Sequence, residues 1–122
     1  FNEENTLLEK SENGTPQVGV LYGRLVKGKF KYFDEGNEKY DPKYVGEILN
    51  GLPHGQGIHY SPYGDLYKGE YKFGKRNGEG TFIYSDGTTK YIGEFKDDKN
   101  WNTIGYDKEG NIIGKYVNGV EQ

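Results

Sequence analysis

The chain has 122 residues and a formal net charge of −3, with 20 glycines, 12 tyrosines, and no cysteine or methionine. The missing cysteines exclude disulfide frameworks, thiolate zinc sites and cysteine nucleophiles, and no apolar run approaches the ~18 residues that a membrane span needs. Alanine is absent as well, so a helical bundle is not expected, whereas the glycines and aromatic residues predict one domain of turn-rich β-structure.

The N-terminal segment, residues 1–17, is acidic. Its acidic side chains Glu3, Glu4, Glu9 and Glu12 stand against Lys10 alone. In the rest of the chain acidic and basic side chains are equal in number, so their charges sum to zero. We expect this segment to be flexible or to form a short helix that covers part of the domain, and its residues do not decide between the two. A nucleic-acid surface needs a concentrated basic stripe, so nucleic acid is not expected as a partner.

Residues 18–122 contain an internal repeat. The central glycines Gly23, Gly46, Gly69, Gly93 and Gly114 follow one another at nearly constant intervals. Each has an apolar or aromatic side chain two positions before it and another two positions after it. The predicted units are 21–43, which is shortened, 44–66, 67–90, 91–111, which is degenerate, and 112–119, a single capping strand.

The second half of the unit also repeats. A Gly-x-Gly pair stands at Gly55–Gly57 and at Gly78–Gly80, and Thr103-Ile104-Gly105 is aligned with these pairs. A turn then follows at Gly64, at Asp86-Gly87 and at Glu109-Gly110. Each unit is therefore predicted to form two strands joined by glycine-containing turns, which is a β-hairpin.

Alternation within a strand predicts how the hairpins are covered. From Tyr67 to Phe73, aromatic residues and glycine alternate with lysine and glutamate, which is typical of a strand with one apolar and one wet face. A single hairpin is barely stable in water, so the units must stack edge to edge. The predicted fold is all-β: an elongated, twisted, single antiparallel β-meander of stacked hairpin repeats, each roughly as long as the unit 44–66.

This pattern resembles the MORN repeat (membrane occupation and recognition nexus). The best copy runs from Tyr67-Lys-Gly-Glu-Tyr to Asp86-Gly87, and the copy at 44–66 has the variant His54-Gly-Gln-Gly57. The resemblance covers roughly residues 21–119. It implies a scaffolding or interaction module without turnover.

Candidate chemical sites are weak in this sequence. His54 and His59 are the two imidazoles, with Asp65 as the nearby carboxylate, and two histidines do not make a metal site. The stretch from Asp98 to Glu109 mimics an EF-hand loop but has Thr103 where that loop needs glycine. The Gly-x-Gly pairs are not expected to bind phosphate, because a strand follows them. We therefore expect no metal, no cofactor and no catalytic site.

An aromatic strip on one face is the remaining candidate site. It has two interpretations that hold for different residues: hydrophobic cover for a sheet without a second layer, or a groove that binds a partner. The candidate partner-binding residues are Tyr71, Phe73, Phe82 and Tyr84, with Lys75, Arg76 and Trp101 at the rim. The favoured partner is another protein or a second copy of the chain, and exposed sheet edges invite strand addition. Weak attachment to anionic lipid is the alternative, because basic side chains outnumber acidic ones in the unit 67–90. Glycan binding is a third possibility, without a carboxylate pair to support hydrolysis.

Overall fold

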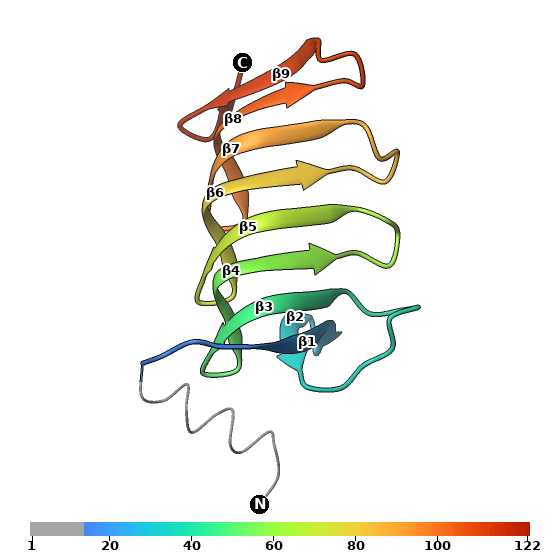
Figure 1. Ribbon diagram of the computed structural model, residues 1–122, viewed down its shortest axis with the longest axis vertical. Helices are drawn as coiled ribbons and strands as arrows, with labels where there is room; N and C mark the ends of the chain where they lie inside the picture. Colours follow the sequence, from blue (N-terminus) through green and yellow to red (C-terminus); the bar gives the residue numbers. More distant parts are fainter. Residues whose placement is uncertain (1–13) are drawn as a thin grey trace, which may run out of the picture.

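The computed structural model describes residues 14–122, and the prediction of a flexible or helical segment falls mostly on residues 1–13, outside this range. The described residues form ten strands stacked along the long axis of the molecule (Figure 1). They are β1 (Gln17–Val26), β2 (Lys29–Phe33), β3 (Lys43–Leu49), β4 (Leu52–Tyr60), β5 (Leu66–Lys72), β6 (Lys75–Ile83), β7 (Lys90–Lys96), β8 (Lys99–Tyr106), β9 (Ile112–Val117) and β10 (Val120–Glu121).

All ten strands belong to one open antiparallel sheet, which confirms the predicted meander of consecutive hairpins. From β3 to β10 the spatial order follows the chain order. The N-terminal end differs, because β1 lies between β3 and β2. The first half of β1 pairs with β3 and its second half pairs with β2. Residues 21–43 therefore do not stack as a shortened copy of the other hairpins. It is Gly19, and not Gly23, that lies opposite Gly46.

A row of glycines crosses the sheet and explains the Gly-x-Gly pairs. It runs Gly19, Gly46, Gly57, Gly69, Gly80, Gly93 from strand to strand and ends at Thr103. The Tyr67 ring lies against this row, where a Cβ atom on Gly80 would be 2.3 Å from the phenolic oxygen. The Tyr67 hydroxyl donates a hydrogen bond to the Glu70 carbonyl at 3.0 Å. The second glycine of the pair therefore makes room for a tyrosine ring.

The first glycine of the pair makes room for a carboxylate. The strand register shifts between Gly69 and Tyr71, and the Glu70 carboxylate there accepts a hydrogen bond from the Glu79 N–H at 2.5 Å. A Cβ atom on Gly78 would lie 2.3 Å from the same carboxylate oxygen. In the unit before, Tyr44, Glu47, Gly55 and Gly57 repeat this arrangement. The Tyr-x-Gly-Glu motif thus fixes the bend and the register of the β3–β4 and β5–β6 hairpins.

The strand register in the degenerate unit 91–111 corrects one predicted alignment. Thr103 lies opposite Gly93, as Gly80 lies opposite Gly69, so it corresponds to the second glycine of the pair and not to the first. The Tyr91 ring instead lies over Gly105 and Gly114, where added Cβ atoms would be 2.5 Å and 2.3 Å away. The cause lies in the length of strand at the register shift. On β6, Arg76 and Gly80 lie on either side of the shift, whereas on β8 the corresponding residues, Asn100 and Thr103, are one position closer together.

The core of this single-layer sheet lies on the face that carries the tyrosine rings, which we call the inner face. Its buried cluster consists of Leu21, Tyr44, Ile48, Tyr67, Tyr71 and Phe95. The rings meet edge to face, with centroids 5.1 Å apart for Tyr44 and Tyr71, and 5.1 Å apart for Tyr67 and Phe95. Such pairs contribute about 0.5–1.5 kcal/mol each beyond their buried area. The cluster joins β1 to the three hairpins that follow it.

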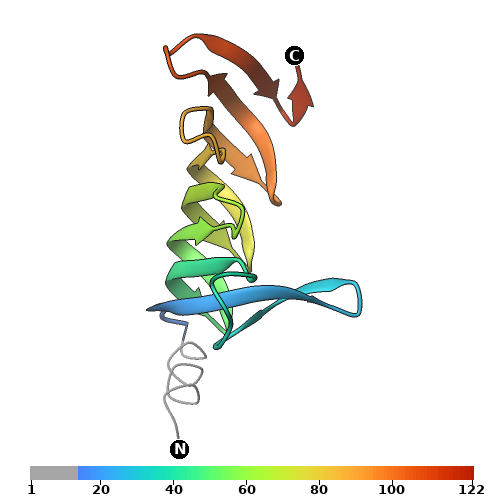
Figure 2. The same ribbon diagram turned by 90° about the vertical axis from the view of Figure 1, so that its right-hand side faces the viewer.

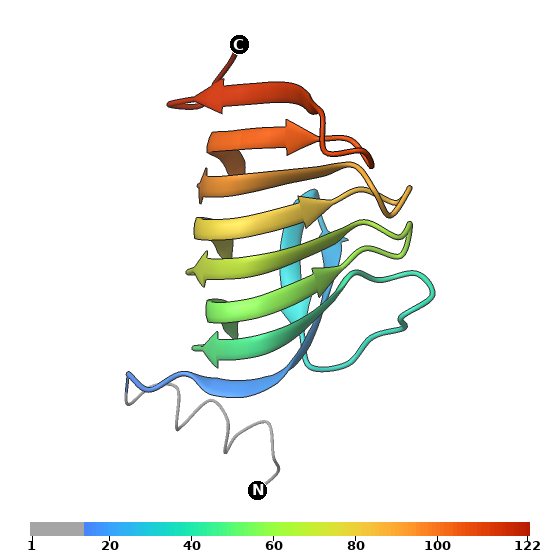
Figure 3. The same cartoon turned by 45° about the horizontal axis from the view of Figure 1, so that its top comes forward.

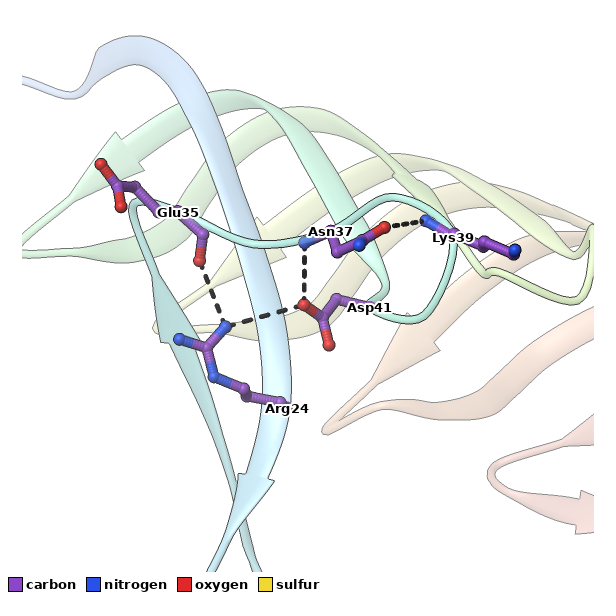
Figure 4. A network of polar contacts seen from close by, with 5 residues as sticks. All are labelled: Arg24, Glu35, Asn37, Lys39 and Asp41. Carbon is purple, nitrogen blue, oxygen red and sulfur yellow. Dashed lines mark hydrogen bonds and ion pairs between the residues drawn. The ribbon is translucent and has the colours of Figure 1, made fainter.

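The β1–β2 hairpin leaves the stack at its N-terminal end (Figure 2) and crosses behind the strands in the tilted view (Figure 3). Tyr32 of β2 packs against the buried cluster. Arg24 holds the base of this hairpin, because its guanidinium lies 3.9 Å from the Phe33 ring centroid. The guanidinium also lies 3.8 Å from the Asp41 carboxylate (Figure 4). Arg24 also donates a hydrogen bond to the Glu35 carbonyl at 3.2 Å. The hairpin therefore gives the inner face a partial second layer.

Candidate functional site

The tight hairpin turns present one unusual residue. In residues 14–122 the first central residue of each tight turn has a positive φ, and these residues are Lys27, Asn50, Phe73, Asp97 and Asn118. Asparagine and aspartate tolerate this left-handed conformation, whereas a bulky apolar residue is an outlier there. Phe73 adopts it with φ of 49° and remains 63% exposed.

Neighbouring groups hold the Phe73 turn in place. The His54 Nδ1 atom accepts a hydrogen bond from the Phe73 N–H at 3.1 Å, and the two ring centroids lie 4.8 Å apart. Lys72 and Lys75, on either side of the turn, are both exposed. The turn is thus a convex tip with an aromatic centre and a basic rim.

A cleft of about 360 Å³ opens on the inner face beside this tip. One wall comes from the β1–β2 hairpin through Phe30 and Tyr32, and the opposite wall includes Tyr71, Arg76 and Phe82. A smaller hollow of about 210 Å³ shares Arg76 and Phe82 and adds Tyr84 and Tyr91. The Phe82 and Tyr84 ring centroids are 5.1 Å apart. Two adjoining hollows therefore meet at Arg76.

Arg76 sits among three aromatic rings. Its guanidinium carbon lies 5.6 Å from the Tyr67 centroid, 5.4 Å from that of Phe82 and 5.7 Å from that of Phe95. Asp98 accepts hydrogen bonds from the Arg76 side chain and, at 2.9 Å, from its backbone N–H. The Asp98 carboxylate, 3.6 Å from the Arg76 Nε atom, compensates this positive charge and holds the guanidinium plane at the aromatic wall, where it can contact a π-rich partner group.

Burial sets the protonation of the side chains that line the cleft. Burial and the Arg76 charge together lower the pKa of His59, so this imidazole is neutral at physiological pH. Burial raises the pKa of Tyr71, and it raises the pKa of Tyr67 to about 12. These phenols therefore act as neutral hydrogen-bonding groups and not as bases.

The structure brings together only some of the predicted partner-binding residues. Tyr71, Arg76 and Phe82 share the larger cleft, and Arg76, Phe82 and Tyr84 share the smaller one. Tyr71 is only 5% exposed, so it belongs to the hydrophobic cover and forms the base of the cleft.

The other predicted residues lie apart from these clefts. Phe73 and Lys75 belong to the exposed tip. The half-buried Trp101 lies in a separate hollow under the last tight turn, where its ring contacts Gly119 and carries the Lys96 ammonium 4.5 Å above it.

Phe30, Tyr32, His59 and Asp98 line the larger cleft but are absent from the predicted set. His59 was identifiable from the repeat, because it occupies the position that Phe82 occupies one unit later. His59 lies opposite Tyr67 and Phe82 lies opposite Tyr91, each the first tyrosine of the following unit. Phe30 and Tyr32 were not, because β2 lies outside the repeat. Asp98 was identifiable only as a turn residue.

The described residues contain no group of three or more ligating side chains that could hold a metal ion. The cleft carboxylates are already engaged, since Asp65 accepts a hydrogen bond from the Ser85 N–H at 2.8 Å and Asp98 binds Arg76. In the same range there is no helix long and apolar enough to cross a membrane.

Stacked hairpins of fixed register, with a convex tip and shallow clefts, define a β-hairpin repeat module. The model of the MORN repeat family matches three consecutive stretches of this chain, residues 44–65, 67–89 and 91–100. The chain therefore carries MORN repeats, and the resemblance is confirmed. This repeat type is non-enzymatic and commonly serves interaction with proteins or membranes. The match ends at Asn100, before the place where Thr103 breaks the glycine row. No curated protein matches the chain.

Proposed function

We propose that this chain is a non-catalytic interaction module that captures a partner protein around the β5–β6 hairpin. The contact residues of this proposal are Phe73, Lys75, Arg76, Phe82 and Tyr84, with Tyr71 as the buried support beneath them. Trp101 lies in its separate hollow and is not part of this surface. The partner presents an apolar pocket for Phe73 with acidic groups around it, because Lys72 and Lys75 flank this ring and are exposed.

The position of Phe73 is the observation that carries the proposal. A left-handed conformation disfavours phenylalanine relative to the asparagine found in the equivalent Asn50 and Asn118 turns. Its 63% exposure shows that burial recovers little of this cost. Exposed aromatic residues with a fixed conformation are typical anchors at protein interfaces, because little rotational freedom is lost on binding.

The test compares two variants in affinity capture from a lysate of the source cell. Phe73→Asn removes the anchor and gives the turn a residue that suits its conformation, so it is expected to fold at least as stably. Tyr63→Asn is the matched control, because Tyr63 is 85% exposed in the distant β4–β5 loop. We expect one or more proteins to be retained by the parent chain and by Tyr63→Asn, and lost at least tenfold with Phe73→Asn. An identical retained set for all three chains would contradict the proposal.

Anionic membrane attachment is the second candidate, and the same tip supports it. Lys72 and Lys75 flank an exposed aromatic ring. Each basic residue near an anionic bilayer contributes about 1 kcal/mol, so the two lysines with one ring give weak, salt-sensitive binding. Sedimentation with phosphatidylserine-containing vesicles, at low and at high salt, tests this candidate. Lack of sedimentation at low salt, or sedimentation that high salt leaves unchanged, would remove it.

A further inference from the structure

Three Asn-Gly steps lie within residues 14–122, at Asn50-Gly51, Asn77-Gly78 and Asn118-Gly119. A fourth, Asn13-Gly14, begins outside the described residues. Asparagine is a thermolabile residue in proteins, and a glycine after it is the neighbour that protects it least, because glycine has no side chain to shield its backbone nitrogen. The three described steps share this chemistry, so the fold decides which of them reacts.

The reaction begins at the backbone nitrogen of the glycine. This nitrogen attacks the Cγ atom of the asparagine side chain, a new C–N bond forms, and the bond from Cγ to the side-chain nitrogen breaks. Ammonia leaves with the proton of the glycine N–H. Water then opens the cyclic imide at either of its two carbonyls, which gives aspartate or isoaspartate. A hydrogen bond donated by the glycine N–H opposes the first step, because that bond must be given up.

Two of the three steps occupy tight turns of the same kind. Asn50-Gly51 joins β3 to β4, and Asn118-Gly119 joins β9 to β10. Both asparagines are exposed, with φ of 52° and 49°, and the glycines after them have φ of 77° and 82°. Backbone shape and exposure therefore do not separate these two turns. The third step, Asn77-Gly78, lies inside β6, where strand pairing with Phe95 of β7 holds the backbone at Gly78.

A hydrogen bond to the preceding hairpin distinguishes the two turns. The Gly119 N–H donates a hydrogen bond to the Trp101 carbonyl at 2.9 Å. The N–H of Asn118 is also engaged, since it donates to the Asn102 side chain at 2.9 Å. The Gly51 N–H has no acceptor among residues 14–122. The nitrogen that begins the reaction is thus bonded in one turn and available in the other.

The connectivity at the N-terminal end of the sheet explains this difference. In the β5–β6 turn, the Gly74 N–H donates to the Pro53 carbonyl at 2.8 Å. In the β7–β8 turn, the Asp98 N–H donates to the Arg76 carbonyl at 3.1 Å. Each acceptor lies just after the tight turn of the preceding hairpin, on its second strand. The neighbour of β3 is instead β1, the first strand of its hairpin, so that hairpin's tight turn lies at the far end of β1.

We propose that Asn50 is a site of spontaneous deamidation in the folded protein, and that the fold protects Asn77 and Asn118. The product adds a negative charge to the β3–β4 turn, and its isoaspartate form also adds one carbon atom to the backbone there. The reaction requires no partner protein, so the proposal is independent of partner capture.

The modified turn adjoins the turn that presents Phe73. A Cβ atom on Gly74 would lie 3.4 Å from the Leu52 side chain, which follows the Asn50-Gly51 turn directly. Deamidation therefore changes the charge beside the basic rim of the Phe73 tip.

Incubation of the full chain at physiological temperature and pH, followed by tryptic digestion and mass spectrometry, tests the proposal. Cleavage after lysine and arginine places the three steps in separate peptides, residues 44–68, 77–90 and 116–122. We expect peptide 44–68 to deamidate at least about fivefold faster than peptide 116–122, the factor that corresponds to one net hydrogen bond. Fragment ions distinguish Asn50 from Gln56, and labelling by an isoaspartyl methyltransferase identifies the isoaspartate product.

The matched control is the same chain unfolded in urea, in which the turns and their hydrogen bonds are absent. There Asn50 and Asn118 should react at closely similar rates. Equal rates at the two positions in the folded chain, or faster reaction at Asn118, would overturn the proposal. A folded chain in which Asn50 stays intact while the unfolded chain converts would also overturn it. A difference of the same size in urea would assign the cause to the neighbouring sequence and would overturn the role of the fold.

Discussion

Substitution of Gly80 by alanine tests the proposed fit between tyrosine rings and glycine. The added Cβ atom would lie 2.3 Å from the Tyr67 phenolic oxygen and 2.6 Å from two of its ring carbons. The ring has no free space to move into, because it is 1% exposed and packs between Tyr71 and Phe95 at 5.3 Å and 5.1 Å. The methyl group therefore displaces a core side chain and its hydrogen bond to Glu70.

The expected loss of stability follows from three contributions. Overpacking of a tight core costs about 1–3 kcal/mol, and loss of the Tyr67 hydroxyl bond costs about 1 kcal/mol. Alanine recovers about 0.5–1 kcal/mol, because it is less flexible than glycine in the unfolded chain. The free energy of unfolding should thus fall by about 2 kcal/mol, which lowers Tm by roughly 10 °C in a domain of this size.

Urea unfolding followed by the fluorescence of Trp101, the single tryptophan, measures this loss. The matched background is Tyr67→Leu, in which the rigid ring is gone and the methyl group at position 80 meets a smaller, adaptable side chain. Gly80→Ala should cost less in that background by about 1 kcal/mol or more, because the two positions are in direct contact. Equal costs in both backgrounds, or a Gly80→Ala chain as stable as the parent, would refute the fit.

Three further substitutions test the other contacts. Glu70→Ala should destabilise the fold by about 2 kcal/mol in urea unfolding, because it leaves the Glu79 N–H at the register shift without its charged acceptor. The control is Glu79→Ala, which replaces an outward-facing side chain and should change stability by under about 0.5 kcal/mol. Folding lowers the pKa of His59. Below the ordinary histidine pKa of about 6.5 the unfolded chain therefore binds more protons than the folded chain. This contribution to the free energy of unfolding should be fully present above that pH and should decline as the pH falls toward the pKa of the folded state. His59→Phe should remove this part of the decline. The measurement is the difference in urea midpoint between neutral and acidic pH, and the same difference in the parent chain and in His59→Phe would contradict the prediction. Phe73→Asn should raise Tm, since asparagine suits a positive φ; a lower Tm would show that the contact with His54 outweighs the backbone strain.

The glycine spacing was enough to predict the fold, because each unit repeats one physical solution. A ring, a glycine that receives it and a glutamate that closes the bend recur in successive units, so the sequence pattern and the contact pattern coincide. The alignment of Thr103 was wrong for a related reason. The repeat specifies which residue faces the ring. The number of residues in the register shift is instead set by the pairing between β7 and β8, and the spacing of the motifs in the sequence does not reveal that number.

The N-terminal hairpin could not be predicted in this way. Tyr32 covers the inner cluster from a strand that has no counterpart in the repeat, and Arg24 holds that strand through Glu35 and Asp41. These contacts join residues whose spacing carries no periodic signal. As a result the sequence placed Tyr71 among residues of a binding groove, while the structure places it in the buried cluster.

The same reasoning explains why the aromatic face of such a sheet is the more closed one. A single layer has no opposite sheet to pack against, so its largest side chains must fold over their own backbone, and glycine provides the space for them to do so. Tyr44 and Tyr67 are buried by this means. On the other face, Val20, Ile92 and Ile112 have no glycine row beneath them and are 40%, 43% and 66% exposed. In a repeat sheet of this type, a high tyrosine content therefore marks the face that becomes the core, and the face with smaller aliphatic residues is the one that remains available for contact.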